Sequence, residues 1–169
     1  MLKNTTQKGL TLIETLVYVA IFSMFVVTLS SFSDQINSAR LRNQTILEIN
    51  YQGTRIIQDI NSTIRNAVSI NDPVITNSGA TLSLETLDPS TNPTVFSVAT
   101  GTVYIQEGTN DPIALTNDRV EVTDLIFSNM SRVGTPGTIR IRFTLKNSDI
   151  HIKPEEQYTK DFYGSASIR

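Results

Sequence analysis

The sequence predicts an α+β fold in which one long N-terminal helix packs on an antiparallel β-sheet. The densest apolar run lies near the N-terminus and passes into an amphipathic pattern with helical spacing. The remainder is rich in Ser, Thr and Asn and contains segments in which apolar and polar residues alternate. A helix and a sheet that each have one apolar face bury those faces against each other. The chain of 169 residues is long enough for one such domain and an appended element.

The first half of the predicted helix is the apolar run from Leu10 to Phe32, which contains 23 residues and a single charge, Glu14. As a helix it would span roughly 34 Å at about 1.5 Å per residue, and a bilayer core requires about 20 apolar residues. Apolar residues surround this helix, a pattern typical of a segment in lipid. Lys3 and Lys8 precede the run, and such lysines favour an N-terminal end in the cytoplasm. We therefore expect a membrane span at 10–32.

Two other kinds of segment compete with this interpretation. A secretory signal peptide has an apolar core of about 7–15 residues that ends at a small-residue cleavage site. Here the run is longer, the sequence "TLSSFSDQ" is a poor cleavage site, and Glu14 would be unusual in such a core. A core helix of a soluble domain would be apolar on one side only. Both alternatives are less consistent with the pattern than a permanent span.

The second half of the predicted helix, 33–69, is amphipathic. Its apolar residues recur mostly at steps of three and four and are Ile36, Ala39, Ile46, Ile49, Ile56, Ile57, Ile60, Ile64 and Val68. Gly53 should weaken the helix by about 1 kcal/mol relative to alanine. The sequence "INDP", which ends at Pro73, favours a stop. We predict one helix over about 10–69.

The remainder, 70–169, is predicted to be a β-rich domain outside the cytoplasm. The segments "ATLSLETL", "RVEVTDLIFSNM", "GTIRIRFTLKN" and "QYTKDFYGSASIR" are predicted strands. In "TVFSVATGTVYIQEG" two strands flank Thr100 and Gly101, which predicts a hairpin. From Ile139 to Leu145 apolar residues alternate with polar ones, which indicates a sheet with one solvated face.

Glu14 is the unusual residue of the apolar run. An ionised acid at the centre of a membrane helix costs roughly 2.5–3.5 kcal/mol on insertion scales, and less near the interface. No Lys or Arg lies between Thr11 and Arg40, so no cation is one or two helical turns away. Either Glu14 is protonated or directed towards the interface without a role, or its partner comes from another chain.

The stretch "KGLTLIETLVYVAIF" resembles the N-terminal signal of type IV prepilins and of the pseudopilins of type II secretion. A glycine after a basic leader, the sequence Thr-Leu-Ile-Glu and a long apolar helix coincide in it. The resemblance implies that a prepilin peptidase removes residues 1–9 by cleaving between Gly9 and Leu10 and then methylates the new amine of Leu10. It also implies that Glu14, the fifth residue of the mature chain, pairs with the Leu10 amine of a neighbouring subunit. Most family members have phenylalanine where Leu10 stands.

The resemblance further implies a pilin-like fold and a structural function. The chain would be a minor pilin or pseudopilin of a type IV pilus, a type II secretion system or a competence filament. Its partners would be prepilin peptidase, other pilin subunits, an inner-membrane assembly platform and, before assembly, membrane lipid. It would first span the inner membrane with its N-terminus in the cytoplasm and then enter a periplasmic or extracellular filament.

The alternative is a membrane-anchored binding module that is displayed on such a filament and contacts DNA, a surface or a secreted substrate. DNA would require clustered basic residues. Arg132, Arg140 and Arg142 form a small cluster, which is also explained as the solvated face of a strand. Lys146 on the same face would favour the alternative.

Enzymatic, metal and cofactor sites are not predicted. The net charge is −2, cysteine is absent, and no motif for a nucleophile, a phosphate or paired acids occurs. The lone His151 is expected to be a strand or loop side chain. Asn110, Asp111, Asn117 and Asp118 would offer oxygen ligands to calcium, but turn formation by Asx residues and proline explains them better.

Overall fold

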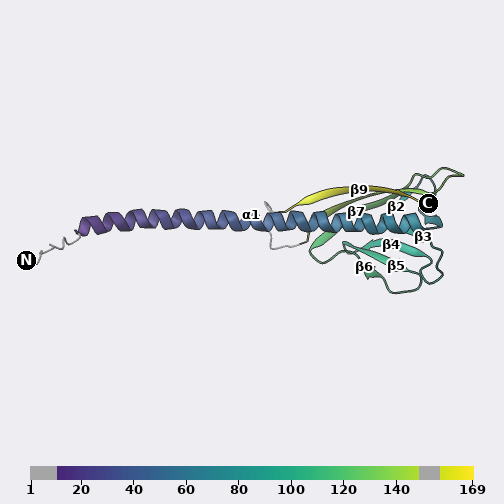
Figure 1. The fold of residues 1–169 in the computed structure, drawn as a ribbon, viewed down its shortest axis with the longest axis horizontal. Coiled ribbons are helices and arrows are strands. Elements are labelled where there is room, and N and C mark those ends of the chain that lie inside the picture. Colours follow the sequence, from purple (N-terminus) through teal and green to yellow (C-terminus); the bar gives the residue numbers. More distant parts are fainter. Residues whose placement is uncertain (1–10, 149–156) are drawn as a thin grey trace, which may run out of the picture. The chain divides into compact units, whose positions relative to one another are not determined.

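The computed structural model describes residues 11–148 and 157–169, which form one helix and nine strands. By its contacts the chain divides into two compact units, Met1–Leu41 and Arg42–Arg169. Helix α1, Leu12–Asn66, runs through both units (Figure 1). The predicted long helix and antiparallel strands are therefore confirmed as an α+β fold.

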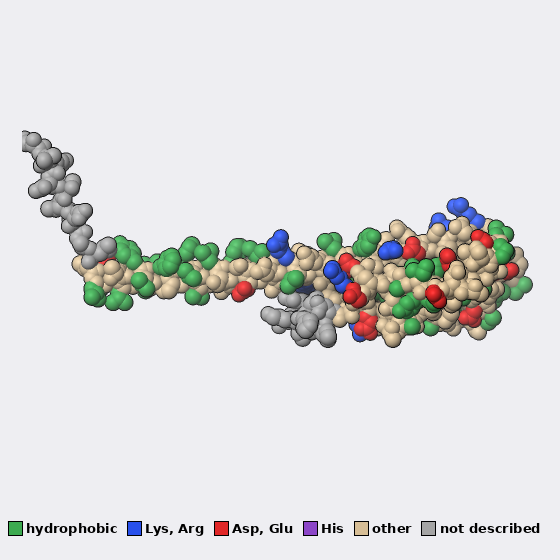
Figure 2. Space-filling model, turned by 90° about the horizontal axis from the view of Figure 1, so that it is seen from below, with side chains coloured by type: hydrophobic (Ala, Val, Ile, Leu, Met, Phe, Trp, Pro, Cys, Tyr) green, Lys and Arg blue, Asp and Glu red, His purple; other side chains and the backbone are tan. Residues whose placement is uncertain are grey.

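In the first unit, the described residues of α1 are not packed against other elements. Every described residue from Thr11 to Asn37 is exposed, and Figure 2 shows hydrophobic side chains along this part of the helix. Four side-chain hydroxyls each donate a hydrogen bond to the backbone carbonyl of a residue three or four positions earlier, which satisfies them without water. They belong to Thr15, Ser23, Thr28 and Ser31. By length and composition α1 can cross a membrane.

The second unit contains two antiparallel sheets rather than the single sheet that was expected. The five-stranded sheet has the order β1-β3-β4-β5-β6, and the four-stranded sheet has the order β2-β7-β8-β9. In Figure 1, β2 and β9 lie above the helix and β4 to β6 lie below it. The strands are β1 Ser69–Asp72, β2 Ser78–Gly79, β3 Leu82–Glu85, β4 Thr94–Ala99, β5 Thr102–Glu107, β6 Ile113–Ala114, β7 Val120–Asn129, β8 Thr138–Asn147 and β9 Thr159–Ser167.

The helix and both sheets share one hydrophobic core. The helix contributes Ile49, Ile56, Ile60 and Ile64, all fully buried. The predicted alternation in β8 is confirmed, because Ile139, Ile141, Phe143 and Leu145 are fully buried, whereas Arg140 and Arg142 are exposed. Burial of one such side chain contributes about 1.5–3 kcal/mol, so this core accounts for the association of the helix with the sheets.

The helix ends at Asn66, three residues before the predicted end at 69. The amide of Val68 donates to the carbonyl of Glu85 at 2.7 Å, and Ser69 starts strand β1. Val68, predicted to be an apolar residue of the helix, is 49% exposed. Pairing with β3 replaces the last helical turn because it satisfies the same backbone groups within a sheet.

A β-bulge in β7 keeps one face of the strand in the core. Thr123 pairs with Thr144 and Ile126 pairs with Arg142, so β7 has one more residue than β8 in this interval. Asp124, with φ 54°, lies in the bulge. Val122 is buried before it and Leu125 after it. The inserted residue shifts the alternation by one position.

Candidate functional site

The residues of the predicted processing site lie at the start of the chain. Gly9 and Leu10 are outside the described residues, which begin at Thr11. Thr11 directly precedes helix α1, and its side-chain Oγ1 accepts a bond from the amide of Glu14 at 3.4 Å. Thr11 is therefore the N-cap and Glu14 the third helical residue, the spacing of a capping box.

Only one half of that capping box is formed. In a complete box the acid at the third position accepts from the amide of the N-cap residue. Instead, Oε1 of Glu14 accepts a hydrogen bond from the hydroxyl of Tyr18 at 3.2 Å. Positions i and i+4 are neighbours on a helix surface, so Tyr18 can reach the carboxyl group. Sequence reasoning overlooked Tyr18, although its spacing from Glu14 was visible.

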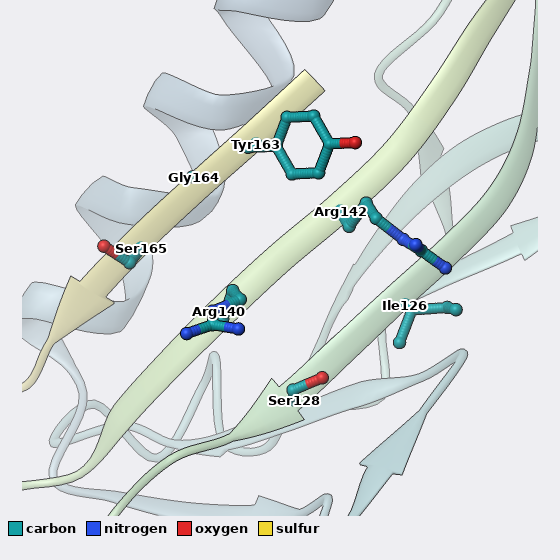
Figure 3. Close-up of a pocket in the computed structure, with 7 residues that line it drawn as sticks. All are labelled: Ile126, Ser128, Arg140, Arg142, Tyr163, Gly164 and Ser165. Atoms are coloured by element: carbon teal, nitrogen blue, oxygen red, sulfur yellow. The ribbon is translucent and has the colours of Figure 1, made fainter. Parts of the chain in front are cut away.

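A shallow groove with a volume of about 710 Å³ lies on the outer face of the four-stranded sheet. Its lining residues come from β7, β8 and β9 (Figure 3) and are Ile126, Ser128, Arg140, Arg142, Tyr163, Gly164 and Ser165. Pairing across the strands forms two rows. Arg142 lies between Ile126 and Tyr163, and Arg140 lies between Ser128 and Ser165. The groove offers two guanidinium groups beside an aromatic ring and two hydroxyls.

The positive charge of this face does not extend along the sheet. Lys146 lies on the same face as Arg140 and Arg142, a position that would favour DNA binding, but its Nζ is 3.0 Å from Oε2 of Glu121. One row closer to the groove, Thr144 donates to Asp161 at 2.7 Å. The face therefore has two adjacent arginines and beyond them a neutralised pair and an acid.

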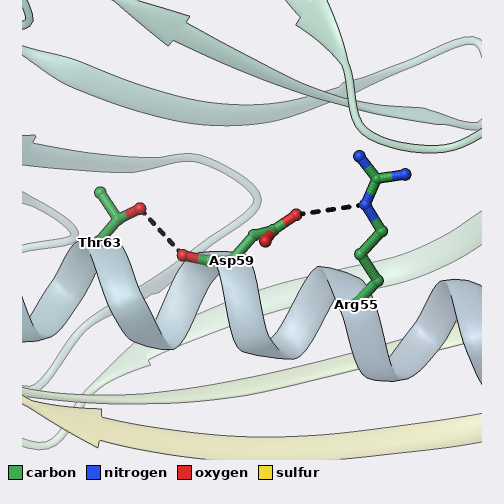
Figure 4. A network of polar contacts seen from close by, with 3 residues as sticks. All are labelled: Arg55, Asp59 and Thr63. Carbon is green, nitrogen blue, oxygen red and sulfur yellow. Dashed lines mark hydrogen bonds and ion pairs between the residues drawn. The ribbon is translucent and has the colours of Figure 1, made fainter.

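Charged contacts on the helix serve the fold. Arg55 and Asp59, at i and i+4, approach to 3.7 Å, and the hydroxyl of Thr63 donates to the Asp59 carbonyl at 2.9 Å (Figure 4). The side chains of Arg55 and Asp59 are about half exposed. Exposed pairs of this kind contribute about 0.3–0.5 kcal/mol. They indicate a solvated helix face rather than a site.

A second polar cluster joins the helix to the loop before β7. Oε1 of Glu48 accepts from Nε2 of Gln52 at 3.0 Å and from Nδ2 of Asn117 at 2.7 Å. These bonds, with that from Gln52 the stronger influence, hold the pKa of Glu48 below its ordinary value, and the charge of Arg119 acts in the same direction. Sequence reasoning did not identify this cluster because Glu48 and Asn117 are 69 positions apart.

Two of the loop residues that could offer ligands to calcium, Asn110 and Asn117, form local hydrogen bonds. Oδ1 of Asn117 accepts from the amide of Arg119 at 3.2 Å, and the carbonyl of Asn110 accepts from Gln106 at 3.2 Å. In the neighbouring loop, Asp88 accepts from the amide and the hydroxyl of Ser90, which lowers the pKa of Asp88. Among the described residues no group of three or more His, Asp or Glu could hold a metal ion. His151 lies outside the described residues.

A family model described as the prokaryotic N-terminal methylation motif matches residues 4–30, which include Gly9, Leu10 and Glu14. This is the prepilin-type signal, and it is consistent with type IV pilins and pseudopilins. The motif implies processing by prepilin peptidase and assembly with other pilins. No curated protein and no solved structure matched the chain.

Proposed function

We propose that the chain is a structural subunit, a minor pilin or pseudopilin, of a type IV pilus, a type II secretion system or a competence filament. The observation that carries this proposal is the continuity of the methylation motif at 4–30 with an uncovered apolar helix that joins a folded β-rich unit. A motif for cleavage and methylation without such a helix would have no part to insert into a filament core.

The proposed sequence of events follows the chain from its N-terminus. Residues 10–32 hold the chain in the inner membrane, and 33–169 lie outside the cytoplasm. Prepilin peptidase cuts between Gly9 and Leu10 and methylates the Leu10 amine. An inner-membrane platform then moves the subunit from lipid into the filament. There the carboxylate of Glu14 pairs with the Leu10 amine of a neighbour, since a buried charge without a partner is strongly penalised.

Processing and assembly are tested separately. The full chain is expressed with and without a prepilin peptidase, and the mature N-terminus is read by mass spectrometry. We expect methylated Leu10 with the enzyme and no processing of Gly9→Val. Normal processing of Gly9→Val would contradict the proposal.

Assembly is tested with Glu14→Ala. This variant should be processed but should enter filaments poorly; incorporation equal to wild type would contradict the ion pair. The number of copies per filament separates a minor subunit from a major one.

A second function, a binding module displayed on the filament, is favoured by the groove between Arg140, Arg142 and Tyr163. Two arginines beside an aromatic ring suit an anionic partner. The full chain would be titrated at low salt with a fluorescent single-stranded oligonucleotide and with an acidic peptide. Binding that is lost in Arg140→Ala/Arg142→Ala and kept in Arg65→Ala, an exposed helix residue, supports this function. Equal behaviour of both variants contradicts it.

A further inference from the structure

The hydroxyl of Tyr18 differs in its use from other hydroxyls of the apolar segment. Thr15, Ser23, Thr28 and Ser31 each donate to a backbone carbonyl on the same helix, at 2.7 to 3.1 Å. The phenol of Tyr18 stands at the end of a rigid ring and donates instead to a side chain, Oε1 of Glu14. A phenol in an apolar environment requires a partner, and here that partner is the acid.

Glu14 in turn has few alternatives. No Lys or Arg occurs between Thr11 and Arg40, and the return bond of the capping box is not formed in the described part of the chain. In lipid an acid without a donor is costly. Tyr18 provides the donor within the same chain and directs the carboxyl group along the helix, away from its first residue.

The bond occupies one carboxylate oxygen and leaves the other available. Tyr18 donates to Oε1, and no described residue donates to Oε2. A carboxylate accepts several hydrogen bonds through its two oxygens. An amine that arrives from another subunit can therefore bind Oε2 without displacing Tyr18.

We infer that Tyr18 is a positioning residue for Glu14, which satisfies the acid in the membrane before assembly and presents its second oxygen to the amine of a neighbouring subunit. This inference rests on the proposed filament function for its second half only. The contact within one chain exists before any assembly.

The contact is tested first, in the full chain reconstituted in lipid vesicles. Solid-state NMR measures the transfer of magnetisation between the Tyr18 ring carbon that bears the hydroxyl and the Glu14 carboxyl carbon. We expect a cross peak in wild type and a shift of the carboxyl signal in Tyr18→Phe, which keeps the ring and removes the hydroxyl. Absence of the cross peak, or an unchanged carboxyl signal in Tyr18→Phe, overturns the inference whether or not filaments form.

The role in assembly is tested by the initial rate of incorporation into filaments. Tyr18→Phe should lower the rate about tenfold, as expected for loss of a hydrogen bond to a charged group. In the Glu14→Gln background the same change should have little effect, because Tyr18 acts through Glu14.

Thr15→Val is the matched control. It removes a hydroxyl that donates to the Leu12 carbonyl, and it should assemble like wild type. An equal loss in Thr15→Val and Tyr18→Phe, or a full effect of Tyr18→Phe in the Glu14→Gln background, overturns the role. Failure of the wild-type chain to enter filaments contradicts the proposed function and leaves the NMR contact to decide the inference.

Discussion

The ring of Phe162 occupies the space that a side chain on Gly53 would need. A Cβ built on Gly53 would lie 2.2 to 2.6 Å from three ring atoms of Phe162. The ring is 7% exposed and stacks on Phe143 with 5.3 Å between centroids. In addition, Nζ of Lys160 lies 5.2 Å from the ring centre and donates to Asn50 at 2.5 Å. The glycine that weakens the helix is thus where strand β9 reaches it.

Gly53→Ala should destabilise the second unit although alanine favours a helix by about 1 kcal/mol. The added methyl group must displace a buried ring that is stacked on Phe143, and overpacking of a core costs about 1–3 kcal/mol. After the gain in helix propensity is subtracted, we expect a net loss of up to about 2 kcal/mol in the free energy of unfolding. Urea unfolding of the full chain in detergent, followed by tyrosine near-UV circular dichroism, measures it.

The neighbouring Thr54 provides the control because it is exposed on the same helical turn. Thr54→Ala should change the free energy of unfolding by less than about 0.5 kcal/mol. In a Phe162→Leu background the cost of Gly53→Ala should shrink, since a smaller side chain leaves space. An equal cost in both backgrounds would show that the ring does not require the glycine.

Thr100→Asn should stabilise the hairpin between β4 and β5. Thr100 and Gly101 form its two-residue turn with φ values of 50° and 75°. Positive φ at both central positions favours the pair Asn-Gly, whereas threonine is β-branched and disfavours that region. We expect a gain of about 0.5–1 kcal/mol in the free energy of unfolding, measured by the same urea titration.

Gly101→Ala is the opposing variant of that turn. A Cβ on Gly101 would lie 2.4 Å from Cγ of Glu121, and the residue has positive φ. It should lose more stability than Thr100→Asn gains. A stabilised Gly101→Ala or a destabilised Thr100→Asn would contradict the turn geometry.

Local patterns predicted most of the fold, because periodicity reports which face of an element is buried. The buried isoleucines of α1 and of β8, and the hairpin at Thr100 and Gly101, follow such patterns. The short strands β1, β2 and β6 were missed because two to four residues have too little periodicity to detect. The division into two sheets and the bulge at Asp124 depend on pairing between distant residues, which a single sequence does not encode locally.

At the candidate site, the sequence predicted those features whose residues lie close together along the chain. The motif around Gly9 and Glu14 lies within one continuous stretch, and the match at 4–30 confirms that stretch as a methylation motif. The groove beside Arg140 and Arg142 also needs β7 and β9, which come from elsewhere in the chain. Alternation in β8 predicted an exposed face but not its hollow or the pairing of Lys146 with Glu121.

Asn129→Ala should strongly destabilise the loops at one end of the four-stranded sheet. Asn129 is 2% exposed, donates to the Pro73 carbonyl at 2.7 Å and accepts from the Ser131 amide at 3.0 Å. Removal of its amide leaves buried groups without partners, which costs about 1–3 kcal/mol for each group. We expect a loss of about 2 kcal/mol or more in the urea titration. Asn110→Ala, at an exposed turn, should change little; an equal effect of the two variants would exclude the buried network as the cause.

Glu48→Gln should lose stability in a pH-dependent manner. In the folded chain the bonds from Gln52 and Asn117 hold the pKa of Glu48 below its ordinary value of about 4.5. The unfolded chain therefore binds a proton at Glu48 at a higher pH than the folded chain does, so the carboxylate contributes stability that is fully present above about pH 4.5 and is lost as the pH falls through the folded pKa. The difference in free energy of unfolding between wild type and Glu48→Gln should be constant from about pH 6 to 8 and should shrink below about pH 4.5. Other acids, including Asp88, titrate in both proteins and cancel in this difference.

Asn117→Ala is the control. It removes one of the two donors to Glu48 and should reduce the pH-dependent part of the difference. A difference that stays constant down to pH 3, or that grows as the pH falls, would show that Glu48 is not held as a carboxylate by these bonds.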